Sequence, residues 1–296
     1  MQPSVRSVFH APSHTFSYVV WDPATRRAAI IDPVLDYDPH SGRTGTQTAE
    51  QLVAIVEAEG LRVDWLLETH AHADHMSALA FLKTRFDAAT AIGERITEVQ
   101  ARFARLFHLD EGFATDGRQF DHCFADGETF ALGELRAQVF HTPGHTSDHI
   151  TYVIGDAVFV GDTLFMPDAG TARCDFPAGS AQDLYRSIHR LFAALDEDQR
   201  VFLLHDYGTD TRGPACETTI GEQRQANIHV AEGVSEDDYV AMREARDATL
   251  PMPVLILPAV QVNIRAGHFP PPESNGLRYL KIPVDEFGAH WQPRDR

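Results

Sequence analysis

The fold of this chain is decided by the stretch Thr69-His70-Ala71-His72-Ala73-Asp74-His75, which places three imidazoles and a carboxyl group within six residues. It closely follows Trp65-Leu66-Leu67, a short apolar run that is typical of a buried strand. Borderline metals accept histidine and aspartate as ligands, whereas a buried cluster of these residues without a metal leaves polar groups unpaired. The stretch therefore predicts a metal site at a strand end, and a solvated loop is the alternative interpretation.

Three more candidate donors follow other predicted strands. Alternating or continuous apolar residues predict strands at 135–139, 157–160 and 201–204, and the donors that come after them are His145, Asp162 and His205. Each of these residues alone would be an ordinary polar group. Because all of them stand at matching strand ends, a shared metal centre is the better explanation.

The rest of the pattern mixes strands with helices. A hairpin is expected in the first forty residues, and Gly155-Asp156 signals another. Thr48 and Gln51 have the spacing of a capping box, which predicts a helix that ends at Gly60. Further helices are expected around 76–82 and after Ser180.

Composition excludes several classes of partner. The chain has 296 residues, and its 25 Lys and Arg against 43 Asp and Glu give a net charge of -18, so nucleic acid is not an expected partner. Its apolar runs are far shorter than the ~20 residues that span a bilayer, so no membrane association is expected. The first residues form no apolar leader and the three cysteines form no CxxC pair, which favours a cytoplasmic protein.

Taken together, these motifs resemble those of a known family. The order and spacing of His70–His75, Pro143-Gly144-His145-Thr146, Gly161-Asp162 and His205 are similar to the metallo-β-lactamase superfamily over roughly residues 8–230. The resemblance implies an α+β fold, a four-layer αββα sandwich with the metal at one edge. We expect a catalytic domain at 1–230 and a C-terminal extension at 231–296 packed on the core.

Within the superfamily, the chain resembles the persulfide dioxygenase branch, also called the ethylmalonic encephalopathy protein family, whose nearest relatives are glyoxalase II enzymes. The stretches that carry this resemblance are Glu68 to His75, Thr171-Ala172-Arg173-Cys174-Asp175-Phe176 and His205-Asp206-Tyr207. Two positions depart from the pattern: Asp148 stands where many relatives have Gly, and Thr171 where some dioxygenases have Cys.

The resemblance implies two possible metal arrangements. In the dioxygenase branch a single Fe(II) per chain is bound by His70, His145 and Asp162, which leaves about three coordination positions open for a sulfur and dioxygen. His72, Asp74, His75 and His205 then orient the ligands. In the dinuclear zinc hydrolases, one ion is bound by His70, His72 and His145, the other by Asp74, His75 and His205, and Asp162 bridges them.

The preferred function is an iron-dependent dioxygenase that oxidises the persulfide of glutathione, or of another low-molecular-weight thiol, with dioxygen to sulfite and free thiol. Arg173 and Tyr207 are the candidate substrate-binding residues, with a surface ion pair and a core aromatic as their alternatives. One rival is a dinuclear zinc thioester hydrolase of the glyoxalase II type, and another is a non-catalytic persulfide-sensing or partner protein. The branch also makes a homodimer possible, and Cys174 is expected to be a buried apolar residue rather than a reactive thiol.

Overall fold

Two mixed β-sheets face each other in the computed structural model, which describes residues 2–110 and 112–286. In spatial order, the described strands of the first sheet are β1 (Ser4–His10), β2 (Thr15–Trp21), β3 (Arg27–Ile31), β6 (Arg62–Leu67), β8 (Ala89–Gly93) and β9 (His122–Phe124). Those of the second are β10 (Thr129–Leu132), β11 (Leu135–His141), β12 (Ile150–Ile154), β13 (Ala157–Phe159), β14 (Arg200–Phe202) and β15 (Glu217–Thr219). A smaller sheet pairs β5 (Arg43–Gly45), β4 (Val34–Asp38) and β7 (Met76–Ser77).

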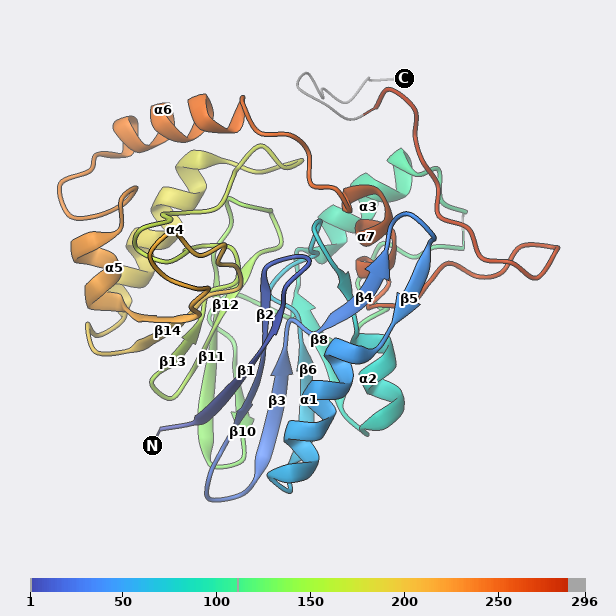
Figure 1. Ribbon diagram of the computed structural model, residues 1–296, viewed down its shortest axis with the longest axis horizontal. Helices are drawn as coiled ribbons and strands as arrows, with labels where there is room; N and C mark the ends of the chain where they lie inside the picture. The colour runs from blue at the N-terminus through green and yellow to red at the C-terminus, as the bar shows by residue number, and fades with distance from the viewer. Residues whose placement is uncertain (1, 111, 287–296) are drawn as a thin grey trace.

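Helices form the two outer layers. On the first sheet lie α1 (Gln47–Ala58), α2 (Leu79–Arg85), α3 (Ile96–Leu106) and α7 (Ile256–Asn263), and on the second lie α4 (Ala181–Ala194), α5 (Ile220–Ala226) and α6 (Glu236–Asp247) (Figure 1). The four-layer αββα sandwich expected from the sequence is thus confirmed. Within the described residues, no helix is long and apolar enough to cross a bilayer.

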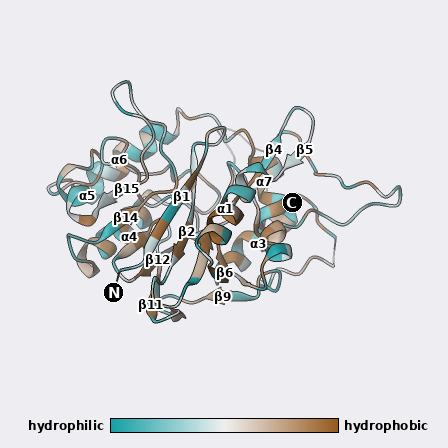
Figure 2. Cartoon of the chain, turned by 60° about the horizontal axis from the view of Figure 1, so that its bottom comes forward, coloured by the Kyte–Doolittle hydropathy of each residue, from teal (hydrophilic) through white to brown (hydrophobic). Residues whose placement is uncertain are grey.

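The core is divided among the layers. Between the sheets, alternate residues of β2 such as Tyr18 and Val20 pack against Tyr152 and Phe159 of the second sheet. Two further apolar clusters fill the outer interfaces. One lies between the first sheet and its helices, and the other lies between the second sheet and its helices. Figure 2 shows hydrophobic residues concentrated in the central strands, with hydrophilic residues on the outer loops. Because the cores occupy the faces of the sheets, the strand ends remain available for polar side chains.

Local signals succeeded where no distant group competed. Ser180 caps α4 by accepting a hydrogen bond from the backbone N–H of Asp183, as expected. The capping box at Thr48 was wrong: α1 begins at Gln47, and the Thr48 hydroxyl donates to the Asp36 carboxylate at 2.6 Å. The helix expected around 76–82 begins only at Leu79, because Met76 pairs in β7 with β4.

The C-terminal region packs on both halves of the sandwich. Tyr239 of α6 is buried in the cluster beneath α4, whereas Val260 and Val262 of α7 join the core of the first sheet. Residues 287–296 of the expected extension lie outside the described residues. This region therefore contributes to two layers of the fold.

Candidate metal centre

Four loops bring the candidate donors to one rim of the sandwich. Residues 69–75, here called the histidine loop, follow β6 of the first sheet, whereas the donors His145, Asp162 and His205 follow β11, β13 and β14 of the second. The two sheets are joined at this rim, where the Ile150 N–H donates to the carbonyl oxygen of Thr69 at 2.9 Å. The centre therefore forms only when both sheets are in place.

The first group consists of His70, His145 and Asp162. Asp162 Oδ2 lies 3.3 Å from His145 Nε2 and 3.9 Å from His70 Nε2. One ligand atom from each residue falls within 4.8 Å of the others, and all three residues are buried. Two imidazoles and one carboxylate thus converge on one point, as a mononuclear metal site requires.

The second group contains the remaining donors. His72, Asp74 and His75 also place ligand atoms within 4.8 Å of one another. His205 Nε2 lies 3.2 Å from Asp74 Oδ2 and 3.5 Å from Asp162 Oδ1. Asp162 therefore lies between the two groups, with one oxygen toward each.

Buried atoms without hydrogen bonds mark the space that these donors share. Over the described part of the chain, those left without a hydrogen-bond partner include His70 Nε2, His72 Nδ1, His75 Nε2 and Asp162 Oδ1. A buried polar atom that lacks a partner destabilises the fold by about 1–3 kcal/mol. A cation bound among these atoms would remove that penalty, so the donor set fits a metal ion.

The electrostatic environment favours neutral imidazoles at two of the donors. Burial, together with the neighbouring His72, lowers the pKa of His70 well below its usual value. The same causes lower the pKa of His75 to about 4. A metal competes with protons for imidazole nitrogen, so these two rings are ready to bind one near neutral pH.

His72 differs from His70 in its contacts. Its Nε2 donates to Glu68 Oε2 at 2.8 Å and to Asp32 Oδ1 at 3.0 Å. Although burial alone would lower it, the Asp32 carboxylate and then Glu68 raise the pKa of His72. Burial raises the pKa of Glu68 to about 7. Asp32, which also accepts from the backbone N–H of Thr69, was not among the residues singled out from the sequence.

Hydrogen bonds to the backbone fix the orientation of the other donors. His145 Nδ1 donates to the carbonyl oxygen of Arg173 at 2.7 Å, which leaves the Nε2 lone pair facing Asp162. His149 Nε2 accepts from the backbone N–H of Asp162 at 2.9 Å. Asp148 Oδ2 accepts from the backbone N–H of Ala71 at 2.9 Å. No local sequence pattern assigns this role to His149 or Asp148, yet each bonds to the backbone of a loop that carries candidate donors.

The two candidate substrate residues lie near the rim in different states. The Arg173 guanidinium donates to both Asp175 oxygens at 2.6 and 2.7 Å and to the carbonyl oxygen of Pro251 at 2.6 Å. Tyr207 is exposed, and its ring lies 4.8 Å from the ring of His14. Arg173 is thus engaged within the chain, and Tyr207 is accessible to a ligand.

Helix α6 supports the loop that bonds to His145. The buried carboxylate of Asp247 accepts from the backbone N–H of Cys174 at 2.7 Å, and Arg243 Nη1 donates to the carbonyl oxygen of Thr171 at 3.1 Å. Arg243 and Asp247 are also paired with each other. Burial raises the pKa of the Cys174 thiol far above its usual range, which agrees with the expected apolar role.

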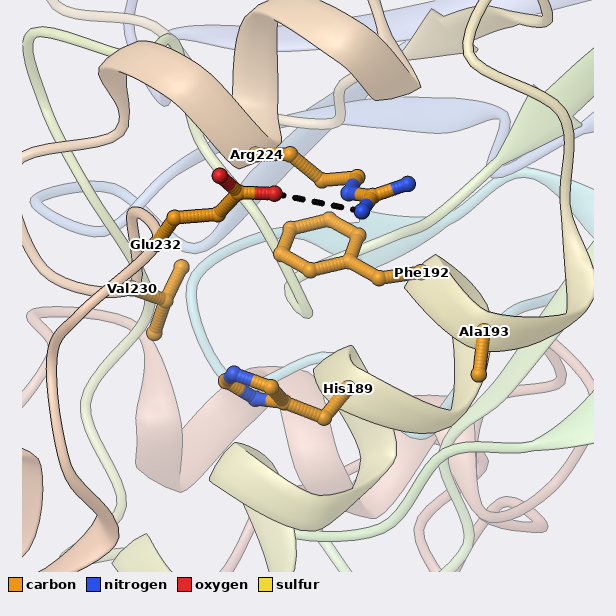
Figure 3. Close-up of a pocket in the computed structure, with 6 residues that line it drawn as sticks. All are labelled: His189, Phe192, Ala193, Arg224, Val230 and Glu232. Atoms are coloured by element: carbon orange, nitrogen blue, oxygen red, sulfur yellow. Dashed lines mark hydrogen bonds and ion pairs between the residues drawn. The ribbon is translucent and has the colours of Figure 1, made fainter.

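A separate pocket of about 230 Å³ lies between α4 and α5, away from these donors. Its lining residues are His189, Phe192, Ala193, Arg224, Val230 and Glu232 (Figure 3). Arg224 and Glu232 form an ion pair of 3.2 Å beside the Phe192 ring. Its lining residues include none of the candidate metal donors.

Comparison with known proteins identifies the family. The model of the metallo-beta-lactamase superfamily matches residues 10–202. The chain belongs to the metallo-β-lactamase superfamily. This confirms the resemblance seen in the His70–His75 and His145 motifs.

Relatives within the superfamily carry different names. A probable metallo-hydrolase of Burkholderia pseudomallei is 52% identical, over 95% of this chain and 99% of that protein. Glyoxylase B2 of Dictyostelium discoideum is 47% identical over 92% and 94% of the two chains. The mitochondrial persulfide dioxygenase ETHE1 of Bos taurus is 31% identical over 90% of each. Among solved structures, ETHE1 from Myxococcus xanthus has a TM-score of 0.71 and 31% identity, covering 90% of this chain and 100% of that one. The similarity to persulfide dioxygenases therefore extends over nearly the whole chain.

Proposed function

We propose that this protein is an iron-dependent dioxygenase that oxidises a low-molecular-weight thiol persulfide, glutathione persulfide in the first instance, to sulfite and free thiol. The observation that carries the proposal is the convergence of His70, His145 and Asp162, two imidazoles and one carboxylate, on one buried point. The similarity to proteins named persulfide dioxygenase over 90% of each chain supports the reaction. The balanced equation consumes one persulfide, one dioxygen and one water, and yields one thiol, one sulfite and two protons.

His70, His145 and Asp162 would hold the ion. Fe(II) bound there supplies open coordination positions at which a sulfur and dioxygen can react. The chain contributes orientation: Arg173 O fixes the tautomer of His145, and His149 fixes the backbone of Asp162. Burial of these donors keeps bulk water from competing for the ion.

The remaining donors would hold and tune this arrangement. His72 is committed through Nε2 to two carboxylates, which separates it from the neutral His70. Asp74 and His205 lie on the other side of Asp162 and would orient its second oxygen. At the rim, Tyr207 would contact the thiol carrier, and Arg173 would bind a carboxylate of that carrier only by exchanging its bonds to Asp175.

The deciding experiment measures metal content and reaction together. Purified protein loaded with Fe(II) is given glutathione persulfide while oxygen uptake and sulfite are recorded, and a parallel sample loaded with zinc is given a glutathione thioester. We expect one iron per chain, equal amounts of oxygen consumed and sulfite formed, and no thioester hydrolysis. Two zinc ions per chain with thioester hydrolysis, and no oxygen uptake, would overturn the proposal.

A dinuclear hydrolase is the second candidate, and one observation favours it. His72, Asp74 and His75 form a second converging group, and Asp162 has one oxygen toward each group, as a bridging ligand would. Two zinc ions in such a site supply a Lewis acid and an activated water. The close relatives named glyoxylase and metallo-hydrolase are consistent with this reaction.

A further inference from the structure

The side chain of Asn263 connects helix α7 to the histidine loop by hydrogen bonds. Its Nδ2 donates to the carbonyl oxygens of His72 and His75, both at 2.8 Å. Its Oδ1 accepts from the backbone N–H of Ser77, also at 2.8 Å. Asn263 is only 4% exposed, so all three bonds form away from water. Both amide hydrogens are used, which only a neutral amide at this position can provide.

These bonds shape the segment that carries Asp74. The carbonyl groups of His72 and His75 flank Asp74 and turn toward the same amide nitrogen, so the backbone between them is bent around it. Ser77 extends the connection, because its hydroxyl donates to Glu68, whose other oxygen accepts from His72 Nε2 at 2.8 Å. Asn263 is thus connected to the loop through its backbone and, by way of Ser77 and Glu68, to the ring of His72.

Helix α7 is itself held firmly beside the loop. Gln100 of α3 donates to the carbonyl oxygen of Ile264 at 3.0 Å, and α7 lies next to α3 (Figure 1). Just beyond the helix, Gly267 adopts a φ of +81°, and a Cβ there would lie 2.9 Å from the backbone nitrogen of Ala80 and 3.0 Å from the carbonyl oxygen of Ser77. The chain after Asn263 is therefore fitted closely against the segment that follows the histidine loop.

We propose that Asn263 is a positioning residue of the metal centre. It sets the curvature of the histidine loop and so places His72, Asp74 and His75 relative to His70. The inference rests on the proposed metal centre but is independent of the reaction catalysed there. Loss of a group that positions a metal ligand typically weakens metal affinity by about 10- to 100-fold, and Asn263 would act on the proposed ligand His70 through the loop that carries it.

The test compares two amides of the same helix. Asn263→Ala removes all three bonds, and Asn263→Asp keeps the acceptor for Ser77 while removing both donors. The matched control is Gln261→Ala: Gln261 is 1% exposed and bonds to the carbonyl oxygens of Leu257 and Lys281 and to the N–H of Lys281, and none of its hydrogen bonds reaches the histidine loop. Both alanine variants therefore lose a buried side-chain amide with three backbone bonds.

The measurements are metal affinity and ligand geometry. Dissociation constants for Fe(II) and Zn(II) come from chelator competition, the absorption bands of Co(II)-loaded protein report ligand geometry, and thermal unfolding of the metal-free variants reports folding. We expect both Asn263 variants to bind metal about 10- to 100-fold more weakly with altered Co(II) bands, and Gln261→Ala to match wild type in both despite a lower Tm.

Equal metal affinity in the Asn263 and Gln261 variants would overturn the inference. Any loss of affinity would then come from general destabilisation and not from the bonds of Asn263 to the histidine loop. If Asn263→Ala does not fold, Asn263→Asp decides the question on the same criteria. A wild-type protein that binds no metal would refute the centre as well as the role of Asn263. A wild-type protein that binds metal but does not oxidise a persulfide would refute only the proposed function.

Discussion

At the scale of single residues, the members of the two donor groups differ in how they lie relative to the point on which the first group converges. His70, His145 and Asp162 converge on one point, whereas His205 lies beside this group, with its Nε2 3.5 Å from Asp162 Oδ1. In a mononuclear site, the first three residues are ligands and His205 is a neighbour that orients one of them. Metal retention in alanine variants can therefore distinguish a mononuclear site from a dinuclear one.

We expect His70→Ala, His145→Ala and Asp162→Ala each to abolish iron retention, because each removes one of three ligands. His205→Ala should keep iron with an affinity weakened by about 10- to 100-fold. The measurement is iron content after gel filtration of each reconstituted variant. Equal loss in all four variants would contradict a mononuclear site.

His229 provides a pH-dependent contact outside the donor set. Its Nδ1 accepts from the backbone N–H of Thr171 at 3.0 Å, and burial, with the nearby Arg243 and Arg246, lowers its pKa to about 4. In the unfolded chain the ring takes up a proton near pH 6.5, so its contribution to stability is present above that pH and is lost as the pH falls toward 4.

Between pH 7.5 and 5, His229 should therefore account for a loss of stability on the order of 1 kcal/mol, reduced by solvent screening of the half-buried ring. We expect His229→Asn to remove this part of the pH dependence, measured as the free energy of unfolding in urea at both pH values. The exposed His268→Asn is the control. A pH dependence in His229→Asn equal to that of wild type would refute the assignment.

At the scale of elements, the turn before His145 depends on close packing against α4. Gly144 has a φ of +140°, and a Cβ there would lie 2.3 Å from the backbone nitrogen of Leu184. Contacts of this length cannot be accommodated without moving one element, so glycine is required for two reasons.

Gly144→Ala should move the His145 turn away from α4 and lower metal affinity by at least about 10-fold, as loss of ligand placement does. The matched control is Gly155→Ala in the β12–β13 hairpin, which also has a positive φ of 60° but lies in a turn without a donor. Metal affinity by chelator competition distinguishes them. A control that loses affinity equally would show that strain alone is responsible.

At the scale of the whole molecule, the two sheets meet at the candidate metal centre. His70 comes from the first sheet, whereas His145 and Asp162 come from the second, so an ion held by all three would link both halves. A ligand that binds only the folded state stabilises it in proportion to the logarithm of its concentration over its Kd.

Metal at about 100 times its Kd should therefore raise the free energy of unfolding by about 3 kcal/mol, and a chelator should reverse the change. Thermal unfolding with and without added Fe(II) or Zn(II) measures this. His70→Ala serves as the control, in which added metal should leave the Tm unchanged. An equal rise in that variant would show binding elsewhere on the chain.

The sequence by itself indicated the candidate donor residues and the layered fold. His70 to His75, His145, Asp162 and His205 could be found because strand periodicity and the end of a strand are local properties. The family motifs then implied the sandwich, which the structure confirmed. Thr48 shows the limit of local signals, because its hydroxyl donates to the carboxylate of Asp36, which lies outside the helix.

Only the tertiary structure decided what holds those donors in place. Asp32, Asp148 and Asn263 bond to the histidine loop from positions that lie 37, 77 and up to 191 residues away in the chain. No periodic pattern marks these residues in the sequence. Their role arises from the packing that brings their side chains beside buried N–H and C=O groups that need hydrogen-bond partners. Such pairings depend on the assembled layers, and no local pattern of residues encodes them.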